Sequence, residues 1–288
     1  MYNKGNELLK LCNEQNKKIS EIVIAKEMAE RGLPYEELID NMKLVLDTMI
    51  SSSKSALNKE VISVSKLTGG DAKKVEKYKN MGNTICGEII NSAMAMALST
   101  SEVNASMGKI VAAPTAGASG ILPSAIIIVS EKYNLSEKEM IYGLFTAGGI
   151  GEIIAKNATI SGAEGGCQAE CGAAAAMAAG AIIEMIGGEP ETSLHGASFA
   201  LLNIMGLVCD PVAGLVEFPC ALRNASGVIN ALVSADLAMA GVKSMVPFDE
   251  VVEAMYKVGK AMPESLRETA LGGVAATPTG EDIKRRIL

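Results

Sequence analysis

The sequence predicts an all-α protein in which residues 1–288 form a single domain. Apolar residues recur at helical spacing over long segments, and no segment shows persuasive strand alternation. Aromatic residues make up 3% of the chain and Trp is absent, so the core must be built from Ala, Val, Ile, Leu and Met. This composition suits closely packed helices better than sheets.

The N-terminal part of the chain contains two stretches with helical periodicity. The first runs from Glu7 to Arg31 and ends at Gly32, and Pro34 then marks a restart. The second runs from Tyr35 to about Leu57. We therefore expect one helix on each side of the glycine.

Later helices are marked by capping residues or proline. Asp71 follows two glycines and can cap a helix that continues through ICGEIINSAMAMALST. Ser136 and Glu139 form a capping box at the start of EKEMIYGLFTAG. Pro247 opens FDEVVEAMYKVGKAM, and we expect an irregular tail after Pro263.

Three glycine-rich segments interrupt this helical pattern. Each would free backbone N–H groups next to a helix N-terminus, which suits a carboxylate or another anion. Tight helix packing is the alternative reading of each segment, and none matches a nucleotide-binding motif. The segments are APTAGASGILP (113–123), TAGGIGE (146–152) and SGAEGGCQAECG (161–172). We expect the central site to lie among these loops.

Charge and hydropathy exclude several classes of protein. The net charge of -7 is spread without a basic stripe, so we expect no nucleic-acid partner. The N-terminus lacks the apolar run of a signal peptide, which favours a cytoplasmic protein. The uncharged run 110–129 contains two prolines and several polar residues, so we expect a buried helix with a functional loop and no membrane span.

The six cysteines fall into two groups. Cys12 and Cys86 lie in helix-like stretches and suit simple burial, whereas Cys167, Cys209 and Cys220 lie at segment boundaries. A thiol near a helix N-terminus is stabilised as the thiolate that ligates metal. Soft thiolates select zinc or an iron–sulfur cluster, and the wide spacing favours a cluster without excluding zinc.

Four segments in combination resemble the α chain of the bacterial iron–sulfur L-serine dehydratases. The segments are SGAEGGCQAECG, GLVCDPVAGLVEFPCALRNA, APTAGASGILP and GGVAATPTG. The resemblance implies a helical catalytic unit in which Cys167, Cys209 and Cys220 hold a [4Fe-4S] cluster. It gives Cys171 no ligand role, and we expect this residue to be a buried helix cysteine.

The implied activity is that of an L-serine ammonia-lyase. L-serine loses water to give aminoacrylate, which tautomerises and hydrolyses to pyruvate and ammonia. Three thiolates on four irons leave one iron open as a Lewis acid for the serine hydroxyl. The usual alternative cofactor, pyridoxal phosphate, needs a Schiff-base lysine and a phosphate-binding glycine loop, and neither is recognisable here.

Substrate-binding candidates come from the polar turns near these motifs. Thr115, Gly117 and Ser119 form a polar turn that suits the substrate carboxylate, although Ser119 could equally be a helix N-cap. Ser161 lies shortly before the first boundary cysteine and could reach the same pocket. His195 is the only histidine, and either a catalytic or a capping role is open to it.

The resemblance also implies a partner. Single-chain relatives carry a further N-terminal domain, which in two-chain enzymes is a separate β subunit, so we expect a hetero-oligomer. Some of those relatives end in a cysteine that caps the open iron, whereas this chain ends in EDIKRRIL. The competing functions are L-cysteine desulfidase, a non-catalytic iron–sulfur electron carrier and a structural zinc protein.

Overall fold

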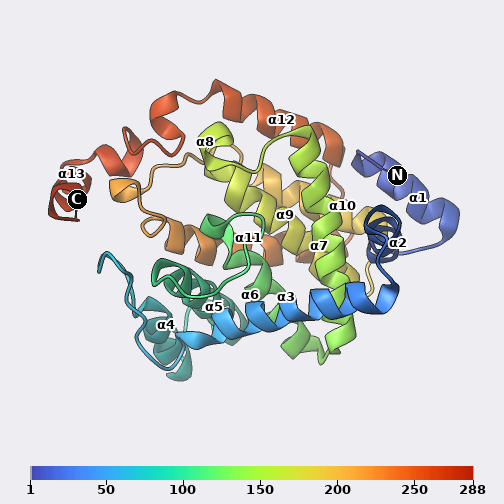
Figure 1. Ribbon diagram of the computed structural model, residues 1–288, viewed down its shortest axis with the longest axis horizontal. Helices are drawn as coiled ribbons and strands as arrows, with labels where there is room; N and C mark the ends of the chain where they lie inside the picture. Colours follow the sequence, from blue (N-terminus) through green and yellow to red (C-terminus); the bar gives the residue numbers. More distant parts are fainter. Residues whose placement is uncertain (1, 288) are drawn as a thin grey trace.

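The computed structural model describes residues 2–287, and the regular structure in this range is helical (Figure 1). Pairing of extended backbone is limited there to two isolated bridges, Ile62 with Gly69 and Cys209 with Arg267. The prediction of an all-α fold is confirmed. The helices are α1 Gly5–Gln15, α2 Ile19–Arg31, α3 Tyr35–Ser55, α4 Asp71–Asn80, α5 Gly87–Ala105, α6 Ile121–Tyr133, α7 Glu137–Asn157, α8 Gly162–Gly165, α9 Ala173–Met185, α10 Pro190–Leu202, α11 Cys220–Met239, α12 Phe248–Ala261 and α13 Pro278–Ile287. Five short helical turns connect them: η1 Ala116–Ala118, η2 Gln168–Gly172, η3 Val212–Gly214, η4 Glu264–Leu266 and η5 Gly273–Ala276.

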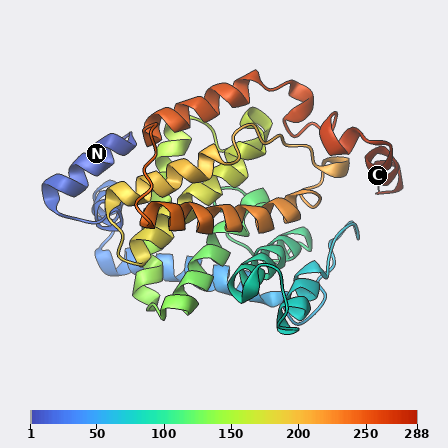
Figure 2. The same cartoon turned by 180° about the vertical axis from the view of Figure 1, so that it is seen from behind.

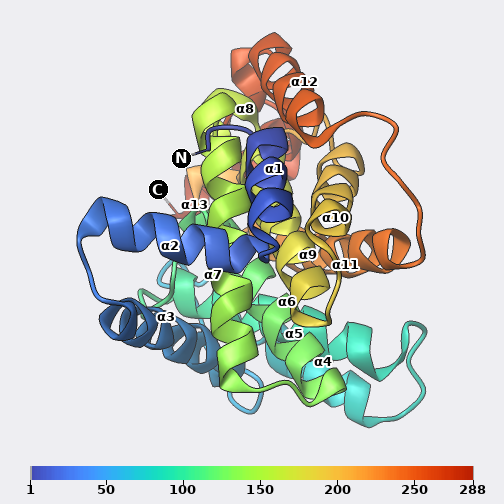
Figure 3. The ribbon, with the colours of Figure 1, turned by 90° about the vertical axis from the view of Figure 1, so that its right-hand side faces the viewer.

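Helix α9 is the centre of the fold, and each of its residues is buried. It packs against α6, α7, α10 and α11, which surround it in Figure 3. Its sequence, AAAAMAAGAIIEM, consists mostly of small side chains, which lets the neighbouring backbones come close. At Gly180 a Cβ atom would lie 2.1 Å from Cδ1 of Ile150, so any larger residue at this crossing would require the Ile150 side chain to move.

Two predicted helices are each broken into two, and this part of the prediction is wrong. The stretch from Glu7 to Arg31 forms α1 and α2, because Asn16 adopts the left-handed conformation at φ 51° and ends α1. The helix predicted from Asp71 onwards stops at Asn80, and α5 starts at Gly87. In this second case the N-cap of α4 is Gly70, so Asp71 does not cap the helix.

The other predicted boundaries agree more closely with the structure. The capping box is present: the backbone N–H of Glu139 donates to Oγ of Ser136 at 3.3 Å, and the Ser136 N–H donates to Oε2 of Glu139 at 2.6 Å. Pro247 is the N-cap of α12. The tail after Pro263 is irregular only as far as Thr277, because α13 follows.

The apolar run 110–129 forms a turn followed by the first part of α6, which is buried. Between residues 2 and 287, no helix combines the length and the apolar character that a membrane span requires. The N- and C-terminal ends of the described chain lie at opposite ends of the molecule in both long-axis views (Figure 2).

A buried carboxylate on α9 joins the central helix to the N-terminus of α2. Glu184 is only 4% exposed, and its carboxylate accepts hydrogen bonds of 3.3 and 3.4 Å from the backbone N–H of Ser20. Burial raises the pKa of Glu184 above its ordinary value of 4.5, with these hydrogen bonds acting in the opposite direction. The folded protein therefore binds this proton more tightly than the unfolded chain does.

Replacing Glu184 with Gln should stabilise the protein at neutral pH by about 1 kcal/mol, because the uncharged amide avoids burial of a charge. For a carboxyl group with a raised folded-state pKa, stability falls as the pH rises above 4.5 and through the folded-state value. The advantage of Glu184→Gln should therefore shrink as the pH is lowered towards 4.5. Urea unfolding at several pH values measures this difference, and a pH-independent difference would contradict the explanation.

Candidate active site around three buried cysteines

Three cysteines from three separate segments lie in the same region of the molecule. Cys167 is the N-cap of η2, Cys209 lies in an extended segment and Cys220 is the first residue of α11. Cys167 and Cys209 are each 3% exposed, and Cys220 is partly buried. Turn η2 packs against α11, which brings the first and last of these segments together.

The pKa values of these thiols depend on one another. Burial raises the pKa of Cys209 far above its usual range and that of Cys220 to about 12, and the charge of Cys167 adds to both shifts. The pKa of Cys167 is lowered, first by its hydrogen bond with Cys171 and further by the charge of Arg223, against the effect of burial. The three thiols therefore share one electrostatic environment, which also contains the positively charged side chain of Arg223.

The three thiols are soft donors of the kind that an iron–sulfur cluster requires. Between residues 2 and 287 no three or more His, Cys, Asp or Glu side chains are arranged to hold one ion. A structural zinc ion needs four ligands converging on one point. In a [4Fe-4S] cluster each thiolate binds a different iron, so the ligands stand farther apart. Three soft donors on separate segments, two of them buried and one partly buried, are compatible with that second requirement.

Cys171 is buried, as expected for a helix cysteine, with a side chain 2% exposed. The C-x3-C spacing on one helical segment brings it next to Cys167: the two sulfur atoms lie 3.3 Å apart, within hydrogen-bonding distance for thiols. Its own pKa is raised well above the usual range, first by this hydrogen bond and then by burial.

Sequence reasoning missed Glu170, whose carboxylate lies between the cysteines and the polar turn. Its Oε1 accepts a hydrogen bond of 2.7 Å from Oγ1 of Thr115, and its Oε2 lies 3.9 Å from Sγ of Cys209. Gly117 and Gly162 flank it so closely that added Cβ atoms would lie 3.3 and 2.6 Å from its oxygens.

The charge of Glu170 is not neutralised by a neighbouring side chain. Within the described chain it forms no ion pair with Lys, Arg or His, and burial raises its pKa. Glu170 lies only three residues after Cys167 in the motif GGCQAECG, which is the signal that could have identified it. The site therefore contains an acidic group able to receive a cation.

The predicted turn around Gly117 is bound directly to the start of α11 by Asn224. The Asn224 side-chain Nδ2 donates to the carbonyls of Gly117 at 2.6 Å and Cys220 at 2.9 Å, and its Oδ1 accepts from the N–H of Gly120 at 2.8 Å. One buried amide therefore holds the candidate substrate-binding turn next to a candidate ligand.

We expect Asn224→Ala to lower the free energy of unfolding by about 2 to 3 kcal/mol, because it leaves two carbonyls and one N–H group without their partner. Chemical denaturation measures the loss. Asn203→Ala is the control, because Asn203 is exposed although its amide also makes side-chain hydrogen bonds. Equal effects of the two substitutions would show that Asn224 does not support the turn.

The remaining candidates differ in their surroundings. Ser119 is 1% exposed, and between residues 2 and 287 its hydroxyl has no hydrogen-bond partner, which leaves it available to a ligand. The N-cap of α6 is Gly120, so the alternative reading of Ser119 as that N-cap is wrong. Ser161 is the N-cap of α8, but its side chain does not cap the helix; the next residue, Gly162, is the one that touches the site.

The C-terminal segment holds the Cys209 loop in place. The backbone N–H of Cys209 donates to the carbonyl of Leu266 at 2.9 Å, and the N–H of Glu268 donates to the Cys209 carbonyl at 2.7 Å. Asp210 pairs with Arg223 at 2.7 Å and also accepts from the N–H of Val274 at 2.7 Å. The Arg223 side chain is therefore held at the Cys209 loop by its ion pair with Asp210.

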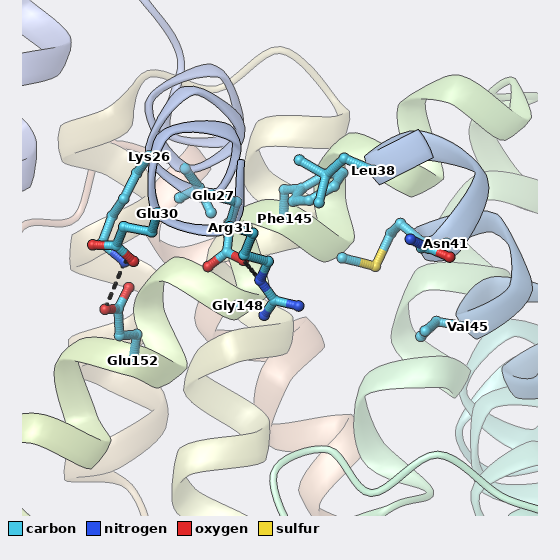
Figure 4. A pocket seen from close by; sticks show the side chains of 12 residues that line it. Lys26, Glu27, Glu30, Arg31, Leu38, Asn41, Val45, Phe145, Gly148 and Glu152 are labelled. Carbon is cyan, nitrogen blue, oxygen red and sulfur yellow. Dashed lines mark hydrogen bonds and ion pairs between the residues drawn. The ribbon is translucent and has the colours of Figure 1, made fainter. Parts of the chain in front are cut away.

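Two other features lie away from these cysteines. His195, on α10, accepts a hydrogen bond of 3.3 Å through Nδ1 from the Ser244 N–H, which indicates a structural role. A cavity of about 510 Å³ lies between α2, α3 and α7 (Figure 4). There Lys26 is already paired with Glu30 at 2.8 Å and with Glu152 at 2.9 Å. Neither feature brings a free reactive group to the thiols.

The comparison with known families identifies the class of protein: the chain belongs to the serine dehydratase alpha chain family, which matches residues 14–275. It is 52% identical to the L-serine dehydratase, alpha chain, of Peptoniphilus asaccharolyticus, over 100% of this chain and 99% of the other. It is 47% identical to a probable L-serine dehydratase, alpha chain, of Bacillus subtilis, over 100% and 95% of the two chains. It is 36% identical to an L-serine dehydratase of Helicobacter pylori, of which it covers 62%.

Proposed function

We propose that the protein is the α subunit of an iron–sulfur L-serine dehydratase that converts L-serine to pyruvate and ammonia. The observation that carries this proposal is the grouping of three electrostatically coupled thiols, two buried and one partly buried, around the carboxylate of Glu170, which forms no ion pair within the described chain. The names of the relatives, which act on L-serine, point in the same direction.

Cys167, Cys209 and Cys220 would hold the [4Fe-4S] cluster. When bound, such a cluster with one iron free of protein ligands supplies a Lewis acid for the serine hydroxyl, which is otherwise a poor leaving group. The positive charge of Arg223 stabilises the thiolate form of Cys167 that ligation requires. Burial of the thiols excludes water and protects the ligand bonds.

The serine zwitterion needs one partner for each charge. Glu170 supplies the negative charge for the α-ammonium group, because no side-chain cation already neutralises it. The turn at Thr115, Gly117 and Ser119 supplies backbone N–H groups and the unpartnered Ser119 hydroxyl for the carboxylate. The hydrogen bond from Thr115 to Glu170 fixes the two halves of this binding site relative to each other.

We also propose that a second chain completes the enzyme. The relatives at 52% and 47% identity are named alpha chains, and the Helicobacter pylori L-serine dehydratase contains a large region outside the match. His195 has a structural partner, so this chain offers no free imidazole at the site. A β subunit would supply the missing region, and with it further groups around the substrate.

The test is anaerobic purification of the chain with and without its β subunit, followed by iron and sulfide analysis and assays with L-serine and L-cysteine. We expect about four irons per chain, pyruvate and ammonia from L-serine, and activity that depends on the second chain. Sulfide released from L-cysteine in preference to pyruvate from L-serine would identify a desulfidase instead. A chain that binds zinc and no iron would refute the proposal.

A further inference from the structure

Cys167 and Cys171 form a pair of neighbouring buried thiols that the proposed reaction does not explain. Their sulfur atoms are 3.3 Å apart, and their side chains are 3% and 2% exposed. The two cysteines are four positions apart on one helical segment, so their Cα atoms lie roughly 6 Å apart. This separation lies within the range that a disulfide spans. The pair can therefore close into a disulfide without a large backbone movement.

The contacts of the other thiols favour this pairing. Within the described chain, the Cys167 thiol forms its hydrogen bond to another thiol with Cys171. The Cys209 sulfur instead contacts the carboxylate of Glu170, at 3.9 Å. Cys12 is buried far along the chain in α1. Cys171 is therefore the nearest thiol with which an oxidised Cys167 can form a disulfide.

We propose that Cys167 and Cys171 form a reversible disulfide when the chain lacks its cluster, so that Cys171 protects a cluster ligand from irreversible oxidation. The disulfide depends only on the position of the two thiols. Its consequence for cluster loading rests on the proposed function.

Hydrogen peroxide is the oxidant that the buried pair can admit, because it is little larger than water. The Cys167 sulfur attacks one peroxide oxygen, the O–O bond breaks, and the leaving hydroxide takes up the Cys167 thiol proton as water, which gives a sulfenic acid. The Cys171 sulfur then attacks the Cys167 sulfur, the S–S bond forms and the hydroxyl group leaves with the Cys171 proton as water. In total, two thiols lose two electrons and two protons, and one peroxide becomes two water molecules.

Glu170 makes the product easy to detect, because it lies between the two cysteines in the sequence. A protease that cuts after glutamate releases GGCQAE and CGAAAAMAAGAIIE as separate peptides unless a disulfide joins them. The full-length chain is freed of iron anaerobically, treated with about three equivalents of hydrogen peroxide, since the sulfinic and sulfonic acids need a second and a third peroxide, then alkylated and digested. We expect joined peptides that dithiothreitol separates, and full recovery of iron binding after reduction.

Cys171→Ser and Cys12→Ser are the matched variants, since both remove a buried thiol. In Cys171→Ser, Cys167 should proceed to sulfinic or sulfonic acid, and reduction should no longer restore iron binding. Cys12→Ser should behave like the unmodified chain. Separate peptides from the unmodified chain, or full recovery of Cys171→Ser, would overturn the inference. Joined peptides from a chain that never takes up iron would support the disulfide and count against the proposed function.

Discussion

Cys220→Ser should remove the iron–sulfur cluster and reduce dehydratase activity to background. Serine keeps the size of cysteine but replaces a soft thiolate with a hydroxyl group, which is a poor ligand for iron in a cluster. Cys220 is partly exposed at the start of α11, so its loss should leave the helical fold intact. Iron content and the electron paramagnetic resonance spectrum after anaerobic reconstitution measure the effect, and circular dichroism checks the fold.

Cys171→Ser provides the control, because it removes a thiol from the same region without removing a proposed ligand. Under anaerobic conditions it should retain the cluster and most of the activity, and the lost packing should cost about 1 kcal/mol of stability. If Cys171→Ser loses the cluster while Cys220→Ser keeps it, then the assignment of the ligands is wrong. This holds whatever the outcome of the peroxide experiment.

Glu170→Gln should raise the KM for L-serine by about 10- to 100-fold, since a charged hydrogen bond to the substrate ammonium contributes about 1.5 to 3 kcal/mol. Gln keeps the volume of Glu and an oxygen that can accept from Thr115, so the substitution removes mainly the charge. The iron content should stay unchanged, because Glu170 is not a proposed ligand. Steady-state kinetics with the two-chain enzyme separate KM from kcat.

Glu164→Gln is the matched control for charge, because Glu164 is exposed and also lies three residues from Cys167. It should leave the kinetics unchanged. A loss of iron in Glu170→Gln would show that the carboxylate supports the cluster, and an unchanged KM would exclude it from ammonium binding. A fall in kcat alone would likewise speak against that role.

The sequence was most informative where a local signal decides the structure. Ser136 and Glu139 cap their helix through neighbouring residues, so the start of α7 could be predicted. The ends of α1 and α4 could not, because helical periodicity continues across both breaks. Asn16 ends α1 by a backbone conformation, and Gly82 is left-handed between α4 and α5.

The candidate site also contains both residues that the sequence could indicate and residues that it could not. Their expected place at segment boundaries drew attention to Cys167, Cys209 and Cys220, although the structure lowers the pKa of Cys167 and raises the pKa values of the other two. The roles of Glu170 and Asn224 depend on contacts between residues 55 and 107 positions apart in the sequence, with Thr115 and Gly117 respectively. No spacing rule links such residues before the chain has folded.

The attachment of the C-terminal segment to the Cys209 loop also bears on the order of events during biosynthesis. Leu266, Glu268 and Val274 hold this loop, and they leave the ribosome after every candidate cysteine. A nascent chain that has exposed every candidate cysteine still lacks the backbone groups that fix Cys209 in place. For the proposed cluster, this means that Cys209 takes up its position as a ligand only after the chain has been made and folded as far as Val274.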